Sequence, residues 1–195
     1  MDKYINDAGI STSKKIGKVG ENAYQKQLEY LKSKGVIRDY LDLRDSKLFR
    51  LADCDFAVYP NDSISRLITV QAAENLLMEK NKSHLEYCRF VDVKTDQVVL
   101  ETGNIFLELI MHGGPGCFGC TWADNWIYVS LDEFGRDIVK AWSLDVRKTR
   151  KLMVDGFLRA GVNLKETRQD GSVALSYLVK TKLLEELGAL KEIKL

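Results

Sequence analysis

Three short apolar segments in the middle of the chain limit what it can fold into. Tyr87–Thr95 (YCRFVDVKT) alternates apolar and polar residues, as a half-buried β-strand does. Asn104–Met111 (NIFLELIM) and Asn125–Leu131 (NWIYVSL) are two more apolar runs of strand length. A glycine-rich connection over 112–120 separates these two runs. The sequence therefore predicts a β-sheet at the centre of the fold.

Helical patterns surround these strands. The run Ser11–Ser13 offers N-caps for a helix over 14–34, and Gly35 is a typical residue at the end of a helix. Further helices are expected at 63–82, 143–157 and 181–187, and further strands at 36–41, 48–59, 137–142 and 174–179. This mixture predicts an α/β protein with a mixed β-sheet flanked by α-helices.

The chain is organised as one domain. It has 195 residues, 45% of them hydrophobic, which suits one compact core, and it holds only two prolines and no low-complexity linker. We expect a single domain over 1–195, with a helical insertion near 63–86 and a C-terminal helix–strand–helix extension over 143–195.

The sequence also predicts a cytoplasmic protein without a membrane partner. No apolar stretch approaches the roughly 18 to 20 residues that span a bilayer. The first residues lack the apolar core of a secretion signal. Four cysteines in a chain of this size do not make a disulfide scaffold, so we expect reduced thiols.

The net charge of +1 conceals an uneven distribution. Residues 1–50 carry a net charge of +4, residues 51–135 carry −8, and residues 136–195 carry +5. Near-neutrality excludes a polycation that coats nucleic acid by bulk charge. An acidic middle between basic flanks can hold cations at its centre and a polyanion around them, although solvated surface charge explains the same distribution.

The triplet Asp92-Val93-Lys94 carries the clearest chemistry, because alternation places Asp92 and Lys94 on one face of their strand. Asp53 and Asp55 share a face of a preceding extended segment. Carboxylates on neighbouring strands bind hard divalent cations such as Mg²⁺, which prefer oxygen ligands. A lysine beside them can hold an attacking water and neutralise charge on a phosphate. These residues are suited to phosphodiester hydrolysis.

Spacing alone is weak support for this site. Two other acid-any-lysine triplets occur, Asp45-Ser46-Lys47 and Glu192-Ile193-Lys194. On spacing alone, a solvent-facing strand edge with solubilising Asp and Lys side chains explains the triplet at 92–94 better.

A family resemblance adds to this pattern. Gly20-Glu21 on a helix, Asp55 on a strand and then Asp92-Val93-Lys94 resemble the PD-(D/E)XK nuclease superfamily. The motifs that follow are similar to those of a phage and prophage branch: Lys94-Thr95-Asp96, Thr102-Gly103-Asn104, Ile105-Phe106-Leu107-Glu108, Thr121-Trp122-Ala123-Asp124 and Tyr177-Leu178-Val179. The resemblance covers nearly the whole chain and is strongest over 90–129.

The resemblance implies a restriction-endonuclease-like core and a Mg²⁺- or Mn²⁺-dependent nuclease, for which we favour DNA over RNA as the substrate. Asp55 and Asp92, with the Val93 carbonyl, would hold the metal. Lys94 would be the catalytic lysine that positions the attacking water. Glu21 would be the helix acid that assists.

The resemblance assigns further positions less directly. Asn104 and Glu108 share a face of their strand and would extend the site, Glu108 as a metal ligand and Asn104 toward nucleic acid. Cys54, not proline, precedes Asp55, and Asp53 is a weaker candidate for the same metal role.

Two basic clusters are candidates for contact with phosphates. Lys14, Lys15 and Lys18 precede Glu21, and Lys148 and Lys151 lie in the helix expected after residue 143. Solvated helix faces carry similar charges in most soluble proteins. A duplex-cutting enzyme of this size would often work as a homodimer.

Two other functions compete with the nuclease. A catalytically inactive relative would bind nucleic acid or a host defence protein, as a phage antagonist does. Cys117 and Cys120 would instead mark a thiol-dependent metal site, but Cys54 and Cys88 lie on separate expected strands, so four ligands are not evident.

Overall fold

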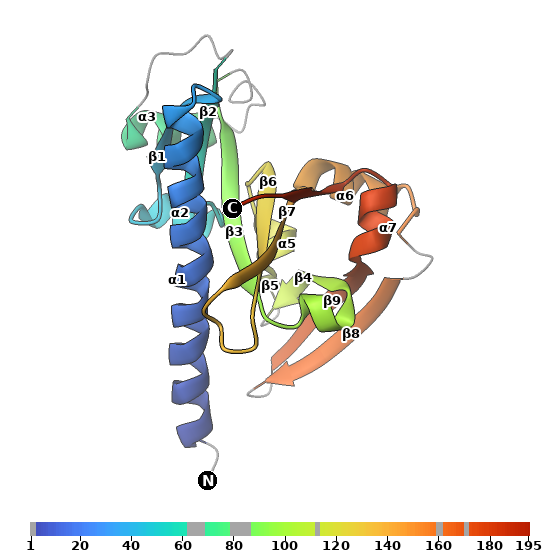
Figure 1. The fold of residues 1–195 in the computed structure, drawn as a ribbon. Helices are drawn as coiled ribbons and strands as arrows, with labels where there is room; N and C mark the ends of the chain where they lie inside the picture. The colour runs from blue at the N-terminus through green and yellow to red at the C-terminus, as the bar shows by residue number, and fades with distance from the viewer. Residues whose placement is uncertain (1–2, 62–68, 79–86, 112–113, 159–161, 170–171) are drawn as a thin grey trace.

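A computed structural model describes residues 3–61, 69–78, 87–111, 114–158, 162–169 and 172–195. The chain is an α/β protein with a six-stranded mixed sheet and a four-stranded antiparallel sheet (Figure 1). No helix in these ranges is both long and apolar enough to cross a bilayer.

The six-stranded sheet has the order β1-β2-β3-β6-β7-β10. Its strands are β1 (Ile37–Asp42), β2 (Phe56–Pro60), β3 (Arg89–Asp96), β6 (Asn125–Leu131), β7 (Ile138–Asp145) and β10 (Leu190–Ile193). Strands β3 and β6 pair in parallel and every other neighbouring pair is antiparallel. The sheet is therefore mixed, as the sequence predicts.

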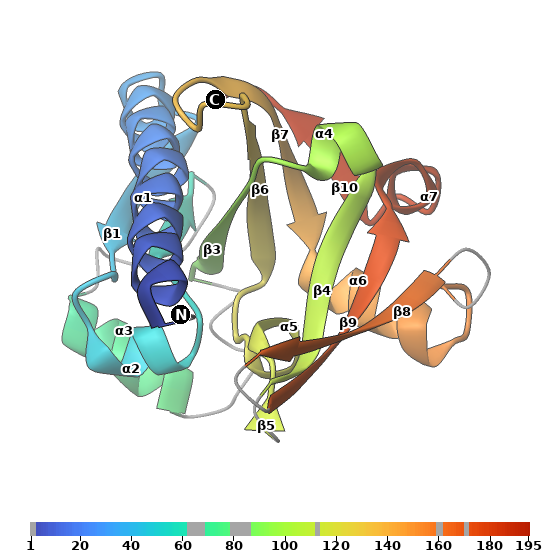
Figure 2. The same ribbon diagram turned by 90° about the horizontal axis from the view of Figure 1, so that it is seen from below.

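The second sheet has the order β5-β4-β9-β8. Its strands are β4 (Asn104–Met111), β5 (Gly114–Pro115), β8 (Val162–Gln169) and β9 (Ser172–Lys180). Figure 2 shows it on the opposite side of the six-stranded sheet from the long helix α1 (Lys3–Ser33). The shorter helices are α2 (Lys47–Leu51), α3 (Val70–Met78), α4 (Val99–Thr102), α5 (Cys117–Cys120), α6 (Val146–Val154) and α7 (Thr181–Glu186).

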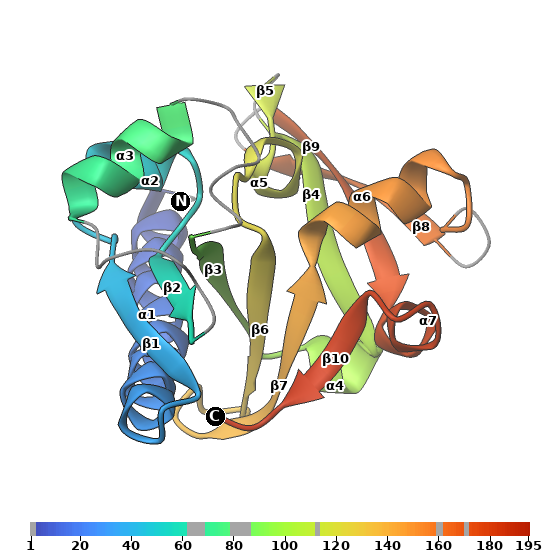
Figure 3. The same ribbon diagram turned by 90° about the horizontal axis from the view of Figure 1, so that it is seen from above.

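Each face of the six-stranded sheet has its own core. On the α1 face, Tyr24 and Leu28 pack against Val91 and Val93. On the other face, Phe90 and Trp126 belong to a larger core that the second sheet and the short helices complete. Figure 3 shows α6 and α7 beside the second sheet, away from α1.

One close approach fixes α1 on the sheet. Gly20 lies so near β3 that a Cβ atom added there would be 2.3 Å from the Oγ1 atom of Thr95. The absence of a side chain at this helix position lets the two backbones approach closely.

Most predicted elements are confirmed, and three segments differ. Helix α1 begins at Lys3, not at residue 14, so Ser11–Ser13 lie inside the helix and do not cap it. The segment 48–59, expected as one strand, begins with α2, because the Ser46 side chain accepts a hydrogen bond from the Phe49 amide and caps that helix. Ser143 was expected to cap a helix, but it lies within β7, and Asp145 caps α6 by accepting from the Lys148 amide at 2.8 Å.

The structure describes part of the insertion expected near 63–86 and most of the extension expected over 143–195. In 63–86, helix α3 is described, whereas 62–68 and 79–86 lie outside the described residues. In 143–195, the chain forms α6, β8, β9, α7 and β10, and β10 pairs with β7 in the six-stranded sheet. The sequence analysis did not predict β8 and β10.

Candidate active site

Asp55 and Asp92 meet where β2 joins β3. The ladder pairs Phe56 with Val91, and the Asp55 amide donates to the Val91 carbonyl at 2.8 Å. The Asp55 Oδ2 atom accepts from the Val93 amide at 2.8 Å. The Asp55 side chain thus takes the place of the next backbone partner in the ladder between β2 and β3, and its carboxyl lies beside β3.

The two carboxyls form a buried pair. Asp92 is 4% exposed, and its side chain lies within hydrogen-bonding reach of Asp55. Burial raises the pKa of Asp55 to about 6, and the charge of Glu21 adds to that rise. Burial also raises the pKa of Asp92 well above its usual range. Without a cation, this pair therefore binds a proton more tightly than isolated carboxyls do.

Lys94 contacts two acids at once. Its Nζ atom lies 2.7 Å from the Asp92 Oδ2 atom and 2.8 and 2.9 Å from the two Asp53 oxygens. Burial lowers the pKa of Lys94, but the charges of Asp92 and Asp53 outweigh burial and raise it overall. Lys94 is therefore an ammonium ion at neutral pH.

Asp53 reaches Lys94 from a strained turn between α2 and β2. Its φ is 54°, in the left-handed region that a residue other than glycine seldom adopts. The hydroxyl of Thr121 donates to the Asp53 carbonyl at 3.0 Å, and Arg150 in α6 donates to the Thr121 carbonyl at 2.9 Å. A chain of contacts thus runs from Arg150 through Thr121 and Asp53 to Lys94.

Glu21 lies on α1 and contacts the site indirectly. Its Oε2 atom is 3.3 Å from the Arg44 guanidinium, which also bonds Asp42 and Gln25. Its charge acts on Asp55, as the pKa of that carboxyl shows. Glu21 is therefore near the metal candidates but already paired with a cation.

Asn104 and Glu108 lie on β4 in the second sheet. Ile105 and Leu107, which alternate with them, are buried in the larger core. Glu108 lies against Gly116, and its charge raises the pKa of Cys117. No direct contact joins Glu108 to Asp55 or Asp92 among the interactions of the described residues, so its assignment as a ligand remains a prediction.

The acids fit a hard divalent cation in part. Among the described residues, no group of three or more His, Cys, Asp or Glu side chains is arranged to hold a metal ion. Asp55 and Asp92 nevertheless bring carboxylate oxygens together. The Val93 carbonyl points to the same side of β3 as the amide that bonds Asp55. Two carboxylates and a carbonyl suit Mg²⁺, which keeps several waters.

The basic clusters occupy separate helices. Lys15 and Lys18 are exposed on α1, and the side chain of Lys14 lies outside the described residues. Lys148 and Lys151 are exposed on α6, where Lys151 pairs with Asp155 at 2.7 Å. Helix α6 and α1 lie on different sides of the six-stranded sheet (Figure 3).

The four cysteines are free thiols. Burial raises the pKa of Cys117 to about 12, so this thiol is protonated at neutral pH. Burial also raises the pKa of the Cys120 thiol.

Sequence reasoning missed the aromatic surroundings of Lys94. Its Nζ atom lies 5.0 Å from the ring centroid of Trp126, which β6 places beside β3. Tyr128 follows two residues later on the same face, and its hydroxyl donates to Asp96 at 2.9 Å. The strand NWIYVSL carried the available signal, because alternation puts both rings on one face.

No family model, curated protein or solved structure matches this chain. The resemblance to the nuclease superfamily accordingly rests on the sequence motifs alone and stays a prediction.

Proposed function

We propose that this chain is a Mg²⁺- or Mn²⁺-dependent nuclease of the PD-(D/E)XK type, from the phage or mobile-element branch, which hydrolyses phosphodiester bonds in DNA. The observation that carries this proposal is the meeting of Asp92 and Lys94, on β3, with Asp55, which directly precedes the neighbouring strand β2. Spacing alone favoured a solvated strand edge, but Asp92 is buried rather than solvent-facing. Burying two carboxyls beside a lysine lowers the free energy of unfolding. Such an arrangement is therefore more typical of a functional site than of a solubilising surface.

In this proposal Asp55, Asp92 and the Val93 carbonyl hold the metal. When bound, the divalent ion supplies Lewis-acid polarisation of the phosphate and acidifies water. The raised pKa of Lys94 makes its side chain a hydrogen-bond donor rather than a base. Lys94 thus orients the attacking water and stabilises negative charge on the phosphate. Glu21 assists through its charge near Asp55.

The fold supports the restriction-endonuclease-like assignment. Asp92 and Lys94 lie on β3 of a mixed sheet, and Asp55 directly precedes β2. Helix α1 covers the opposite face, and the charge of its Glu21 acts on Asp55. The exposed lysines of α1 and α6 supply positive charge for phosphates on either side of the cleavage point.

The test is cleavage of DNA in Mg²⁺ or Mn²⁺ by the whole chain and by Lys94→Ala and Asp92→Ala variants. We expect both variants to lose metal-dependent cleavage while far-UV circular dichroism stays unchanged. Lys194→Ala is the matched control, because Lys194 ends another acid-any-lysine triplet and is exposed at the C-terminal end of the chain. Equal cleavage by the wild type and both site variants would exclude this mechanism.

One observation favours an alternative, a catalytically inactive nuclease-fold protein that binds nucleic acid or a host defence protein. Lys94 is held by Asp53 as well as Asp92, and the described acids do not form a three-ligand metal group. This alternative predicts binding of nucleic acid or of the host protein without cleavage in either metal, and binding that survives Lys94→Ala.

A further inference from the structure

Trp122 is an exposed aromatic residue beside the candidate active site. It lies between α5 and β6 and is 42% exposed. The chain has three tryptophans, and the other two, Trp126 and Trp142, are 0% and 3% exposed. Trp122 is therefore the tryptophan whose ring presents a face to a ligand.

Two hydrogen bonds hold the segment of Trp122 against the turn that carries Asp53. The Trp122 amide donates to the Ala52 carbonyl at 2.8 Å, and the Thr121 hydroxyl donates to the Asp53 carbonyl at 3.0 Å. The Asp53 carboxylate in turn contacts the Lys94 ammonium. The exposed ring thus belongs to a segment that is bonded directly to the acid partner of Lys94.

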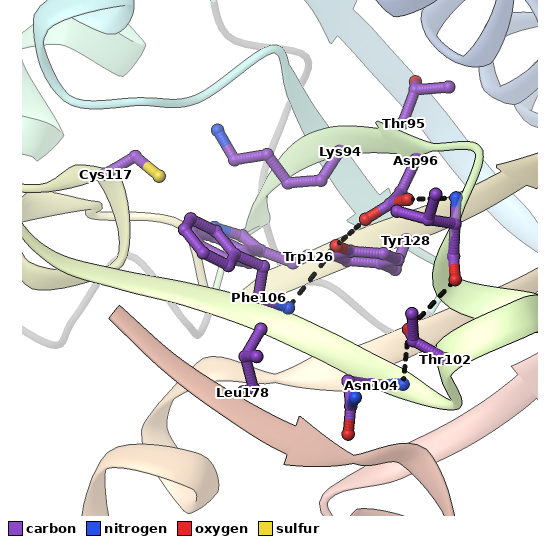
Figure 4. Close-up of a pocket in the computed structure, with 11 residues that line it drawn as sticks. Lys94, Thr95, Asp96, Thr102, Asn104, Phe106, Cys117, Trp126, Tyr128 and Leu178 are labelled. Carbon is purple, nitrogen blue, oxygen red and sulfur yellow. Dashed lines mark hydrogen bonds between the residues drawn. The ribbon is translucent and has the colours of Figure 1, made fainter. Parts of the chain in front are cut away.

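The aromatic rings of the cavity between the two sheets are closed by comparison. This cavity has a volume of about 350 Å³ and lies beside Lys94 (Figure 4). Trp126 and Tyr128 line it, but they are 0% and 3% exposed, so neither presents a face. Figure 4 shows the Lys94 side chain extending toward Cys117, the first residue of α5. The ammonium therefore lies close to the segment that continues into Trp122.

Arg150 of α6 is held against this segment without a carboxylate partner. Its Nη2 atom donates to the carbonyls of Phe118, Thr121 and Gly119 at 2.7, 2.9 and 3.5 Å. Its guanidinium carbon lies 5.5 Å from the centroid of the Phe118 ring. Among the described residues, no Asp or Glu side chain pairs with Arg150, so its positive charge is not neutralised locally.

A second arginine of this kind lies on α2. Arg50 is exposed, and its Nη2 atom donates to the Asp45 carbonyl at 3.5 Å. In the part of the chain that the structure describes, no carboxylate pairs with it. Figures 2 and 3 show α5, which leads into Trp122, between α2 and α6. The exposed ring thus lies between two helices that each carry an unneutralised arginine.

An exposed ring between two such cations matches a single strand of nucleic acid. Every base has a flat face that stacks on an aromatic side chain, and arginine contacts the phosphates on either side. An exposed tryptophan also suits a protein interface, but the uncompensated positive charge favours a polyanion. Bases inside a duplex are already stacked on both faces, so only an unpaired base can lie on Trp122.

We propose that Trp122 is a stacking platform for an unpaired base of the substrate strand, close to the nucleotide whose phosphate lies at Lys94, and that Arg150 and Arg50 contact neighbouring phosphates. The substrate class is therefore single-stranded or locally unpaired nucleic acid rather than intact duplex. This inference rests on the proposed nuclease function for the position of the cleaved phosphate, while stacking on Trp122 does not depend on cleavage.

Tryptophan fluorescence tests the stacking platform without requiring activity. The whole chain, in a chelator, is titrated with a short oligothymidylate and with an abasic strand of the same length. A base stacked on an indole ring quenches its fluorescence, and Trp126 and Trp142 are buried, so the change reports on Trp122. We expect saturable quenching by the oligothymidylate but not by the abasic strand, and none in Trp122→Phe.

An affinity series supplies the second readout. Trp122→Ala should weaken binding of the oligothymidylate about tenfold, the scale of one stacked base, and leave binding of the abasic strand unchanged. Trp122→Phe keeps a ring and should restore most of this loss. Both variants keep the backbone bond to Ala52 and replace an exposed side chain, so the fold should persist.

Two further variants separate charge from stacking. Arg50→Gln should weaken binding of both strands and reduce the slope of log affinity against log salt by about 0.7, because one phosphate contact is lost. Phe134→Ala is the matched control for an aromatic ring. Phe134 is 70% exposed and follows the end of β6, whereas Trp122 precedes its start, so neither strand should bind differently.

The outcomes distinguish the stacking platform from the nuclease. Binding that depends on Trp122, without cleavage in Mg²⁺ or Mn²⁺, retains the platform and rejects the nuclease. Metal-dependent cleavage that requires Lys94, together with wild-type affinity of Trp122→Ala for the oligothymidylate, retains the nuclease and rejects the platform. Failure of the wild type to bind the oligothymidylate also rejects the platform and leaves Trp122 as a candidate residue of a protein interface.

Discussion

The Nζ atom of Lys94 lies 2.8 and 2.9 Å from the two carboxylate oxygens of Asp53. Asp53, in the turn between α2 and β2, thus holds the lysine of β3, although its sequence position suggests only a weaker role as a metal ligand. The geometry makes Asp53 a positioning residue for Lys94, and the left-handed backbone at φ 54° is the conformation that allows this contact.

Asp53→Asn should lower metal-dependent cleavage by about tenfold or more through kcat, with KM little changed, because Lys94 loses one of the two charges that orient it. Asparagine tolerates the left-handed backbone, so the fold should persist. Asp53→Ala should be about 1 kcal/mol less stable than Asp53→Asn in urea unfolding. Equal kcat for Asp53→Asn and the wild type would show that Asp53 does not position Lys94.

Asp55 should make the metal-free protein sensitive to pH. The folded pKa of about 6 exceeds the usual value near 3.9, so the fold favours the protonated carboxyl. The stability contributed by Asp55 is full below pH of about 4 and is lost as pH rises through about 6. Asp55→Asn, which keeps an acceptor for the Val93 amide, should therefore stabilise the metal-free chain at pH 8 by about 1 to 3 kcal/mol.

Thermal unfolding of the wild type and of Asp55→Asn in a chelator checks this. The internal control is pH 4, where the Asp55 carboxyl of the folded wild type is largely neutral, as the asparagine of the variant is. Adding Mg²⁺ at pH 8 should raise the Tm of the wild type and leave that of Asp55→Asn unchanged. A lower Tm for Asp55→Asn at pH 8 in the chelator would contradict the assignment.

Alternation was the property that made the central strands predictable. The ranges expected for β4 and β6 agree with the structure at both ends, and β3 was placed within two residues. The same alternation placed Asp92 and Lys94 on the face opposite Val91 and Val93, which pack against α1. Strand β8 (VNLKETRQ) carries too little apolar pattern to be recognised. Strand β10 (LKEI) is only four residues long, and its pairing with β7 joins segments far apart in the sequence.

The surroundings of the site could not be predicted, because they depend on contacts between distant segments. Nothing local in the sequence indicates that Asp53 adopts a positive φ, or that Arg44 pairs with Glu21 across 23 positions. The cavity between the two sheets requires the parallel pairing of β3 with β6 and the placement of β4, with Phe106, opposite Trp126. Alternation in the sequence predicts on which face of a strand a side chain lies, but not which residue of another segment it contacts.

The contact between Gly20 and Thr95 gives a sharp test of how α1 is seated. Gly20→Ala should destabilise the fold, because its Cβ would lie 2.3 Å from the Thr95 Oγ1 atom. In a Thr95→Ala background the same change should stabilise by up to about 1 kcal/mol, since alanine favours helix more than glycine. Gly17→Ala is the control: its nearest neighbour is 3.9 Å away, so it should stabilise in either background. Urea unfolding of this set gives the coupling energy, and a value near zero would mean that Gly20 does not determine the approach.

Asp124, in the Thr-x-Ala-Asp motif, should be a structural residue rather than a catalytic one. Its carboxylate is 6% exposed, accepts from the Phe90 amide at 2.9 Å at the start of β3, and pairs with Arg147 of α6 at 2.9 Å. The Arg147 side chain is 40% exposed, so solvent screens the ion pair in part. Asp124→Ala should destabilise the chain by about 2 kcal/mol, chiefly because the buried Phe90 amide loses its acceptor.

Lys140 and Glu192 provide the matched surface pair, 2.8 Å apart with 34% and 61% exposed side chains. Glu192→Ala should lower the free energy of unfolding by less than about 1 kcal/mol, because solvent screens the pair.

The catalytic readout separates a structural role of Asp124 from a catalytic one. At a temperature where Asp124→Ala remains folded, the kcat of this variant should equal that of the wild type, since the Asp124 carboxylate bonds the beginning of β3 and not Lys94. A loss of kcat without a loss of stability would instead place Asp124 in the catalytic machinery.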